Sequence, residues 1–288
     1  MRNLILTILA VLIAAPFTLN AQSVKEGNMS EETVAKYSKI SKELLANKDK
    51  SVPELMIIAA KMMLGTEYVA GSLEQVPEKL KVSLVETDCI LFVESCLAMA
   101  LNAKKGLDNP DSLCATVQSL RYRNGKVDGY ASRLHYTSEW IRQGEERGIF
   151  TEITDVLSAD NLSGQRFSYM SEHSGAYKQL KDNPDEVERI AKMENWLNSF
   201  SDYYVIPKAG VNKMEHLLKD GDILGFNSTV KGLDIAHVAL VYHKENGQVG
   251  FIHASQVDGK VVIDEKSIHD YVNSRKSNNG IRIIRVNK

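Results

Sequence analysis

Hydrophobic residues recur at the three- and four-residue spacing of an amphipathic helix through much of the chain between residues 31 and 200. The residues at the start of one predicted helix support this assignment. Asn183 precedes Pro184, and Asp185 and Glu186 follow in a first turn that suits acidic side chains. The periodicity predicts helices over residues 31–45, 53–64, 89–103, 111–120, 132–147 and 184–200.

Residues 89–103 differ from the other predicted helices because they are apolar on nearly every side. A helix without a polar face is normally central and buried. Thr87 or Asp88 can cap its N-terminus, since either side chain can accept a hydrogen bond from a free backbone N–H group. We therefore expect this helix at the centre of the fold.

After Lys219 the pattern changes to short strands separated by turns, predicted at residues 222–226, 237–243, 249–255, 260–263 and 281–286. Helices followed by a strand meander favour an α+β fold, in which the central helix packs on an antiparallel sheet. Residues 104–216 are predicted to form a mostly helical insertion. The insertion would belong to a single domain that covers residues 22–288.

The N-terminus reads as a targeting segment rather than as part of the fold. Arg2 precedes an apolar run over residues 4–15, and Leu19-Asn20-Ala21 follows. This order is typical of a signal peptide over residues 1–21 that is cut after Ala21, and an uncleaved anchor is the alternative. No later segment is long and apolar enough to span a bilayer. We expect a bacterial protein in the periplasm or secreted.

Composition removes several classes of protein. The 288 residues are 43% hydrophobic and 25% charged, with a formal net charge of −2. This balance excludes disordered, collagen-like and coiled-coil chains, and it offers no basic surface for nucleic acid. Three cysteines are too few for a disulfide scaffold. Whether Cys96 and Cys114 form a disulfide remains open from the sequence.

Cys89 would be the first residue of the central helix, where backbone N–H groups lack partners within the helix. Those groups and the helix dipole favour an anion, so we expect this cysteine to ionise more easily than usual. A thiolate is a strong nucleophile. The structural alternative is a buried cysteine that acts as a small hydrophobic residue.

A cysteine nucleophile needs a base, and His237 and His253 lie on two consecutive predicted strands. With a two-residue loop between these strands, the two histidines would face opposite sides of the sheet. A three-residue loop would pair Lys244 with Gln248, place Gly247 in a left-handed conformation and bring both histidines to one face. A base and its orienting partner can therefore adjoin only if the loop has an odd length or a bulge.

Five short motifs follow one another along the mature chain: Gly65-Thr66-Glu67-Tyr68, Asp88-Cys89, Asp220-Gly221-Asp222, His237-Val238-Ala239-Leu240 and His253-Ala254-Ser255. In this order they resemble the NlpC-type papain-like cell-wall hydrolases. The block at residues 122–141 is similar to the N-acetylmuramoyl-L-alanine amidase-like branch. Ile90 departs from the usual serine, and the long gap between Gly71 and Asp88 suggests an added loop over the cleft.

The resemblance implies a papain-like core and a cysteine hydrolase that acts on peptidoglycan without a cofactor or metal ion. It implies that Cys89 is the nucleophile, that His237 is the base and that His253 orients His237. Tyr68 falls where the family lines the nucleophile and would help to bind the reacting oxygen. A thiol and an imidazole that act together are expected to give a bell-shaped pH profile.

The middle of the chain offers groups that suit a peptidoglycan fragment. Arginine presents forked donors for carboxylates, and aromatic rings present flat surfaces for a sugar or peptide. On this chemistry we expect substrate contacts from Arg133, Tyr136, Tyr130, Arg123 and Trp140.

The leading hypothesis is an amidase that cleaves the N-acetylmuramoyl-L-alanine bond of muropeptides. A stem-peptide endopeptidase that cuts a γ-D-glutamyl bond, and a non-catalytic wall-binding module, remain alternatives. A zinc amidase has less support because His135, His173 and His216 are scattered along the chain. An acyltransferase has no supporting feature. The sequence leaves open the oligomeric state, the preference for anhydro sugars or stem length, and the physiological role.

Overall fold

The computed structural model describes residues 28–157, 160–161 and 164–287, so the predicted signal peptide lies outside the described residues. The helices are α1 Glu31–Ala46, α2 Val52–Met62, α3 Cys89–Lys104, α4 Pro110–Arg121, α5 Thr137–Glu146, α6 Tyr169–Glu172, α7 Pro184–Leu197, α8 Lys208–Met214 and α9 Ile268–Ser274. The strands are β1 Glu67–Tyr68, β2 Glu86–Thr87, β3 Phe150–Glu152, β4 Asp160–Asn161, β5 Tyr204–Pro207, β6 Ile223–Ser228, β7 Ile235–His243, β8 Val249–Ser255, β9 Lys260–Ile263 and β10 Asn278–Val286.

The strands form one curled sheet in the order β2-β1-β9-β8-β7-β6-β10-β5-β4, with β3 paired to β10. Its neighbours are antiparallel except for β1 and β2, which run parallel. The fold is therefore α+β with a mixed sheet, and the five strands predicted after Lys219 are confirmed.

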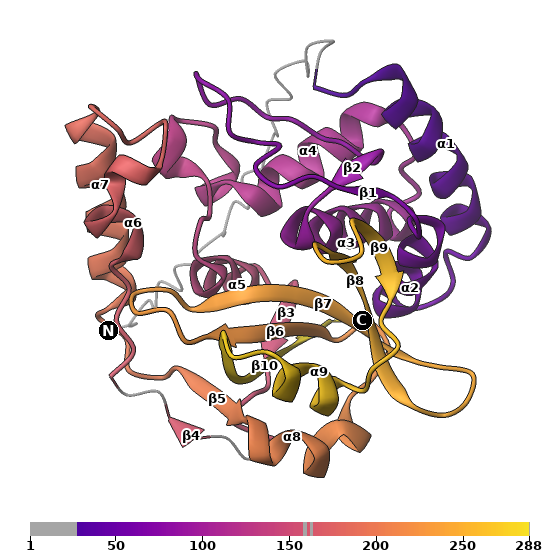
Figure 1. The fold of residues 1–288 in the computed structure, drawn as a ribbon. Coiled ribbons are helices and arrows are strands. Elements are labelled where there is room, and N and C mark those ends of the chain that lie inside the picture. The colour runs from indigo at the N-terminus through magenta and orange to yellow at the C-terminus, as the bar shows by residue number, and fades with distance from the viewer. Residues whose placement is uncertain (1–27, 158–159, 162–163, 288) are drawn as a thin grey trace, which may run out of the picture.

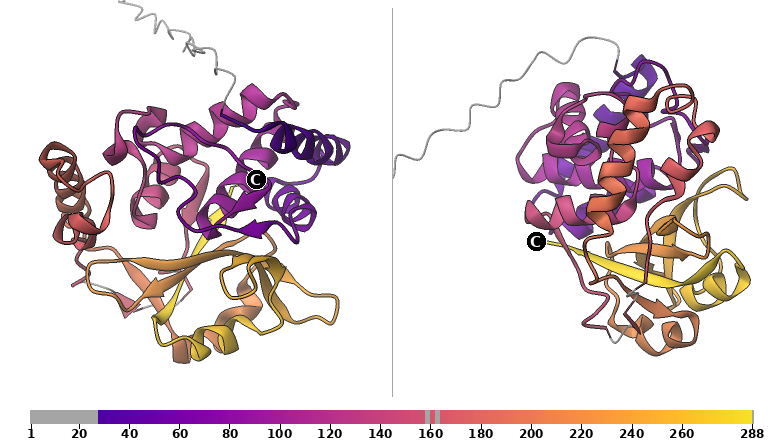
Figure 2. Two further views of the ribbon diagram at one scale, coloured as in Figure 1. Left: turned by 45° about the horizontal axis from the view of Figure 1, so that its top comes forward. Right: turned by 90° about the vertical axis from the view of Figure 1, so that its left-hand side faces the viewer.

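Two groups of helices cover the two faces of the sheet, with α1–α4 above it and α8 and α9 below it (Figure 1). Alternate residues of a strand point to opposite faces, and β7 shows this directly. Val238 and Leu240 join the core under α1–α4, whereas Ala239 and Val241 join the core against α8 and α9. The two further views in Figure 2 show the same order of layers.

Helix α3 is the central helix that the sequence predicts. Asp88 caps its N-terminus by accepting a hydrogen bond from the Leu91 N–H at 2.9 Å. Nearly every residue between Leu91 and Ala103 is buried, and α3 packs against β7 and β8. This packing fixes the start of the helix, and therefore Cys89, beside the sheet.

The segment from 104 to 216 contains α4–α8, but it also supplies β3 and β5, both of which pair with β10. The prediction of one helix over residues 132–147 is partly wrong, because α5 begins only at Thr137. A short 3₁₀ turn at Tyr130–Ser132 precedes it, and Arg133 is extended and bridges to Tyr122. Helices α8 and α9 have seven residues each and were not predicted.

Across residues 28–157, 160–161 and 164–287, no helix combines the length and apolar character needed to cross a membrane.

Candidate active site

Cys89 stands at the first position of α3, directly after the capping residue Asp88. The residue is partly exposed, whereas the other two thiols, Cys96 and Cys114, are buried. The backbone N–H of Val238 in β7 faces the Cys89 sulfur and favours its ionised form. The sulfur therefore lies beside the strand residue that follows His237.

The expectation that Cys89 ionises easily is wrong for the resting protein. Burial raises the pKa of the Cys89 thiol to about 12, and the neighbouring Asp88 carboxylate raises it further. Asp88 occupies the positive end of the helix as its cap, so its charge opposes the effect of the dipole on the sulfur. The thiol is protonated at neutral pH and needs a base to become a nucleophile.

The hairpin between β7 and β8 has the odd loop that the sequence left open. Lys244 N–H donates to the Gln248 carbonyl at 2.9 Å, and Gly247 has φ of +82°. In this register His237 and His253 share one face of the sheet as diagonal neighbours. Their rings meet, with His237 Nε2 2.7 Å from His253 Nδ1.

His237 is held as a neutral imidazole. Burial lowers the pKa of His237 to about 3, and the nearby His253 and Arg275 lower it further, while Asp264 opposes them. The ring stacks on Phe226 with centroids 5.6 Å apart. Because Nε2 is bonded to His253, the other ring nitrogen of His237, Nδ1, takes no part in this bond.

Asp264, in the loop between β9 and α9, extends this chain of polar groups. Its Oδ2 lies 3.3 Å from His253 Nε2, a long contact, and this buried nitrogen has no better partner in the described chain. Burial would raise the pKa of Asp264, but hydrogen bonds from the His253 ring and the Lys266 N–H outweigh it and lower the pKa. Asp264 is therefore an ionised carboxylate behind the two histidines.

Two tyrosines complete the walls around the sulfur. Tyr68 pairs with Thr87 across β1 and β2, so it lies next to the residues that begin α3. Burial, Cys89 and Asp88 raise the pKa of Tyr68 to about 12, which keeps its hydroxyl protonated. Tyr271 of α9 packs edge-on against the His253 ring, 5.7 Å between centroids.

The five residues predicted to bind substrate all have partners within the protein, and Arg133 also lies near enough to Asp88 to act on its carboxylate. Arg133 pairs with Glu74 at 2.7 Å, and Arg123 pairs with Glu139 at 2.6 Å. Arg123 and Glu139 also line a cavity of about 450 Å³ that does not include Cys89. Both arginines are therefore engaged in ion pairs within the described structure.

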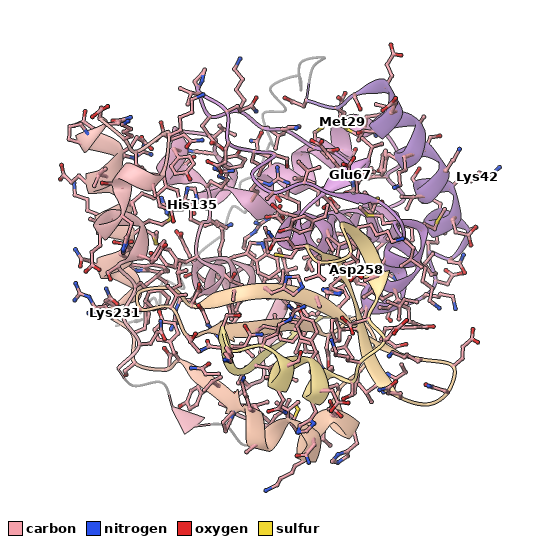
Figure 3. All side chains as sticks on the ribbon, viewed as in Figure 1. Met29, Lys42, Glu67, His135, Lys231 and Asp258 are labelled. Carbon is pink, nitrogen blue, oxygen red and sulfur yellow. The ribbon has the colours of Figure 1, made fainter. Side chains whose placement is uncertain are left out.

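The predicted aromatic contacts are buried. Tyr136 is 1% exposed and donates its hydroxyl to Glu194 at 2.8 Å. Trp140 is 2% exposed and packs on Phe150. Tyr130 packs against His135, which Figure 3 shows toward the α6–α7 end of the molecule. All three rings are therefore packed inside the protein.

Asp264, Tyr271 and Arg275 were missed by the sequence reasoning, although all three surround the histidine pair. They lie in the loop after β9 and on or just after the short α9, which has too few turns to show a clear period. Their position after β9, the strand that pairs with the strand of His253, was the available signal that they lie near the histidines.

Within the described residues, no group of three or more His, Cys, Asp or Glu side chains is arranged to hold a metal ion. Two of the three histidines that were considered for a zinc site have other partners. His135 bonds the Tyr130 carbonyl at 2.8 Å, and His173 bonds the Tyr169 carbonyl at 2.8 Å.

The fold and site together define a class: an α+β protein in which a cysteine at the start of a buried helix lies beside a hydrogen-bonded histidine pair. Residues 58–281 match the family described as AmiA-like, N-acetylmuramoyl-L-alanine amidase-like. The chain belongs to this family.

Several solved structures are similar to this chain. A crystal structure of an N-acetylmuramoyl-L-alanine amidase from Bacteroides uniformis is 33% identical, with a TM-score of 0.74 over 82% of this chain and 99% of that chain. A proposed xylanase from Bacteroides fragilis is 35% identical, with a TM-score of 0.71 over 79% and 99%. Protein LPG0564 from Legionella pneumophila, 22% identical over 88% and 95% with a TM-score of 0.64, shows the fold alone. No curated protein matches the chain.

Proposed function

We propose that this protein is a papain-like cysteine amidase that cleaves the bond between N-acetylmuramic acid and L-alanine in peptidoglycan fragments. The observation that carries the proposal is the hydrogen bond between His237 and His253, with Asp264 3.3 Å behind His253, beside the helix that begins at Cys89. Membership of the amidase-like family supports the substrate class. A cell-wall substrate supports a site of action in the periplasm or outside the cell, as the predicted signal peptide does.

The chain of contacts is consistent with one arrangement of protons. The ionised Asp264 lies 3.3 Å from His253 Nε2 and favours a proton on that nitrogen, which leaves His253 Nδ1 as an acceptor. His253 Nδ1 then accepts from His237 Nε2–H. His237 Nδ1 keeps its lone pair and can take a proton. Asp264 thus sets the tautomer of both rings although it reaches only one of them.

The reaction follows from this arrangement. His237 takes the Cys89 proton as the sulfur attacks the lactyl carbonyl carbon, which forms a tetrahedral oxyanion. The Cys89 N–H and the Tyr68 hydroxyl donate to that oxyanion. His237 returns the proton to the departing nitrogen of L-alanine and leaves a thioester on Cys89. Water, deprotonated by His237, then hydrolyses the thioester and frees the sugar acid and the thiol.

Three alternative functions differ from the proposed one in the bond cleaved or in the residues that they need. A stem-peptide endopeptidase would use the same residues, so the bond choice rests on the family rather than on the site geometry. A non-catalytic wall-binding module would not need a base beside the thiol. A glycosidase such as a xylanase would need two carboxyl groups flanking the scissile bond, and this site presents a thiol and imidazoles there instead.

The test is to incubate the purified protein with defined muropeptides and to weigh the products. We expect an intact stem peptide together with free N-acetylmuramic acid or the disaccharide that contains it. Cys89→Ala should abolish the products, whereas Cys114→Ala, which removes a thiol on α4, should retain them. A sugar that still carries one or two amino acids would contradict the amidase assignment, and full activity of Cys89→Ala would contradict the cysteine mechanism.

A further inference from the structure

Arg275 lies at the C-terminal end of α9, four residues after Tyr271 and on the same side of the helix. Its guanidinium sits over the Tyr271 ring, 4.9 Å from the centroid. It is close enough to His237 to disfavour a positive charge on that ring. Lys208 Nζ donates to the Arg275 carbonyl at 2.7 Å and fixes the backbone there. Arg275 therefore belongs to the wall of the active site.

Arg275 lacks a carboxylate partner among the residues that the structure describes. In the described residues no Asp or Glu forms an ion pair with it, and its buried Nε atom has no hydrogen-bond partner. A half-buried guanidinium without a counter-ion is unfavourable, because removal from water is not offset. Three arginines that are more deeply buried do have carboxylate partners: Arg121 with Glu94, Arg133 with Glu74, and Arg282 with Glu152.

We propose that Arg275 binds a free carboxylate of the substrate, on the amine side of the scissile amide. This inference rests on the proposed function. His237 delivers a proton to the departing nitrogen, so the leaving peptide lies over the His237 ring, on which Arg275 acts. A guanidinium binds a carboxylate through two parallel N–H···O bonds, which gives orientation as well as charge recognition.

The peptide carboxylate would also neutralise the positive charge of Arg275 near His237. The groups around His237 are His253 from β8, Asp264 from the loop after β9, and Tyr271 and Arg275 from α9. Cys89 lies beside Val238, the next residue of β7. The positive charge of Arg275 disfavours the protonated imidazole that His237 must form during the reaction. A bound carboxylate neutralises Arg275, so the correct substrate favours the protonated state of the base.

The nearest free carboxylate on the amine side of a muramoyl peptide is the α-carboxylate of the second stem residue when that residue is D-glutamate. A matched pair of ligands tests it: N-acetylmuramoyl-L-alanyl-D-glutamate and N-acetylmuramoyl-L-alanyl-D-isoglutamine. The two ligands differ only at the α position of the second residue, which carries a carboxylate in the first and a neutral carboxamide in the second. Binding is measured by calorimetry in the Cys89→Ala protein, so that turnover does not interfere.

We expect the carboxylate ligand to bind roughly 10- to 100-fold more tightly than the carboxamide. Arg275→Met, which keeps the aliphatic packing on Tyr271, should abolish this preference. Arg275→Lys should keep part of it, because the charge remains but the fork is lost. Lys276→Met removes a charge from the neighbouring exposed residue and should leave the preference intact.

Equal binding of the two ligands, or a preference that survives Arg275→Met, would overturn the inference. Circular dichroism of each variant separates a local effect from misfolding. The two proposals also fail separately. If the wild-type protein cleaves the amide but Arg275→Met shows no loss of preference, only this inference fails. If no cleavage occurs and the preference still depends on Arg275, only the proposed function fails.

Discussion

Arg121 and Glu94 form an ion pair inside the protein, with Arg121 Nε 2.8 Å from Glu94 Oε2 and each side chain only 4% exposed. Glu94 lies on the helix that begins at Cys89, and Arg121 ends α4. Arg121 also donates to the Lys81 carbonyl. The pair therefore joins α3, which carries Cys89, to α4 and to the long loop before α3.

Removal of one member of this pair should destabilise the fold. Glu94→Leu leaves a buried guanidinium without its counter-ion, so we expect the free energy of unfolding to fall by about 3–5 kcal/mol. Urea denaturation followed by circular dichroism measures it. The double variant Glu94→Leu with Arg121→Met should recover much of the loss. Glu188→Ala, which breaks an exposed pair with Lys192, is the control and should change little. A single variant as stable as the wild type would contradict the argument.

Asp264→Asn should slow the reaction without weakening substrate binding. The neutral amide no longer fixes the two histidine tautomers, so we expect kcat to fall by about 10- to 100-fold with little change in KM. Steady-state kinetics with a muropeptide measures both constants. Asp258→Asn is the matched control, because Asp258 accepts from Ser255 in the β8–β9 turn, where Figure 3 labels it. A larger change in KM than in kcat would place Asp264 in binding instead of positioning.

Tyr68→Phe should reduce kcat because one donor to the oxyanion is lost. The expected loss is about 10²–10³-fold at most, and it should be milder than the loss in Cys89→Ala. Tyr242→Phe, which removes the hydroxyl of a tyrosine packed against Lys61, is the control. Wild-type kcat in Tyr68→Phe would show that the phenol only packs against the site.

The pH profile should be a broad plateau, which revises the bell shape expected from the sequence. The active pair is a neutral His237 with a protonated Cys89, and their pKa values lie near 3 and 12. Activity is lost on the acid side only when His237 gains a proton, so kcat/KM should stay level from about pH 5 to 9. A maximum confined to pH 6–7 would be inconsistent with a buried, neutral base.

The same shift links folding to pH. The unfolded chain binds a proton at His237 near the ordinary pKa of 6.5, whereas the folded chain does not until much lower pH. Stability should therefore fall as the pH drops below 6.5. Circular dichroism at each pH separates this loss from direct protonation of the active enzyme.

The sequence predicted the elements whose pattern is long and regular. Helix α3 and strands β8 and β9 have the expected boundaries to within a residue. An all-apolar helix and a strand meander are each compatible with few alternative structures. The histidine pair depended on one local choice, the loop length before Gln248. The left-handed Gly247 settled that choice in favour of the odd loop.

Two properties of the site could not be read from the sequence. The ionisation of Cys89 depends on how far the sheet and Asp88 desolvate it, and this balance exists only in three dimensions. The role of Asp264 and the exposure of Arg275 depend on a short helix that packing, not periodicity, stabilises. The predicted substrate residues were chosen by type, and the carboxylate partners of Arg133 and Tyr136 came from distant parts of the chain.

The parallel pairing of Tyr68 with Thr87 has a consequence for how this family can diversify. The chain leaves the reaction centre at Tyr68, travels through residues 69–85 and returns to the same place at Thr87. Lengthening such an excursion costs little free energy, since its two ends are already pinned. New residues could therefore be inserted there during evolution, and the range of accepted cell-wall fragments could change while the reacting atoms keep their positions.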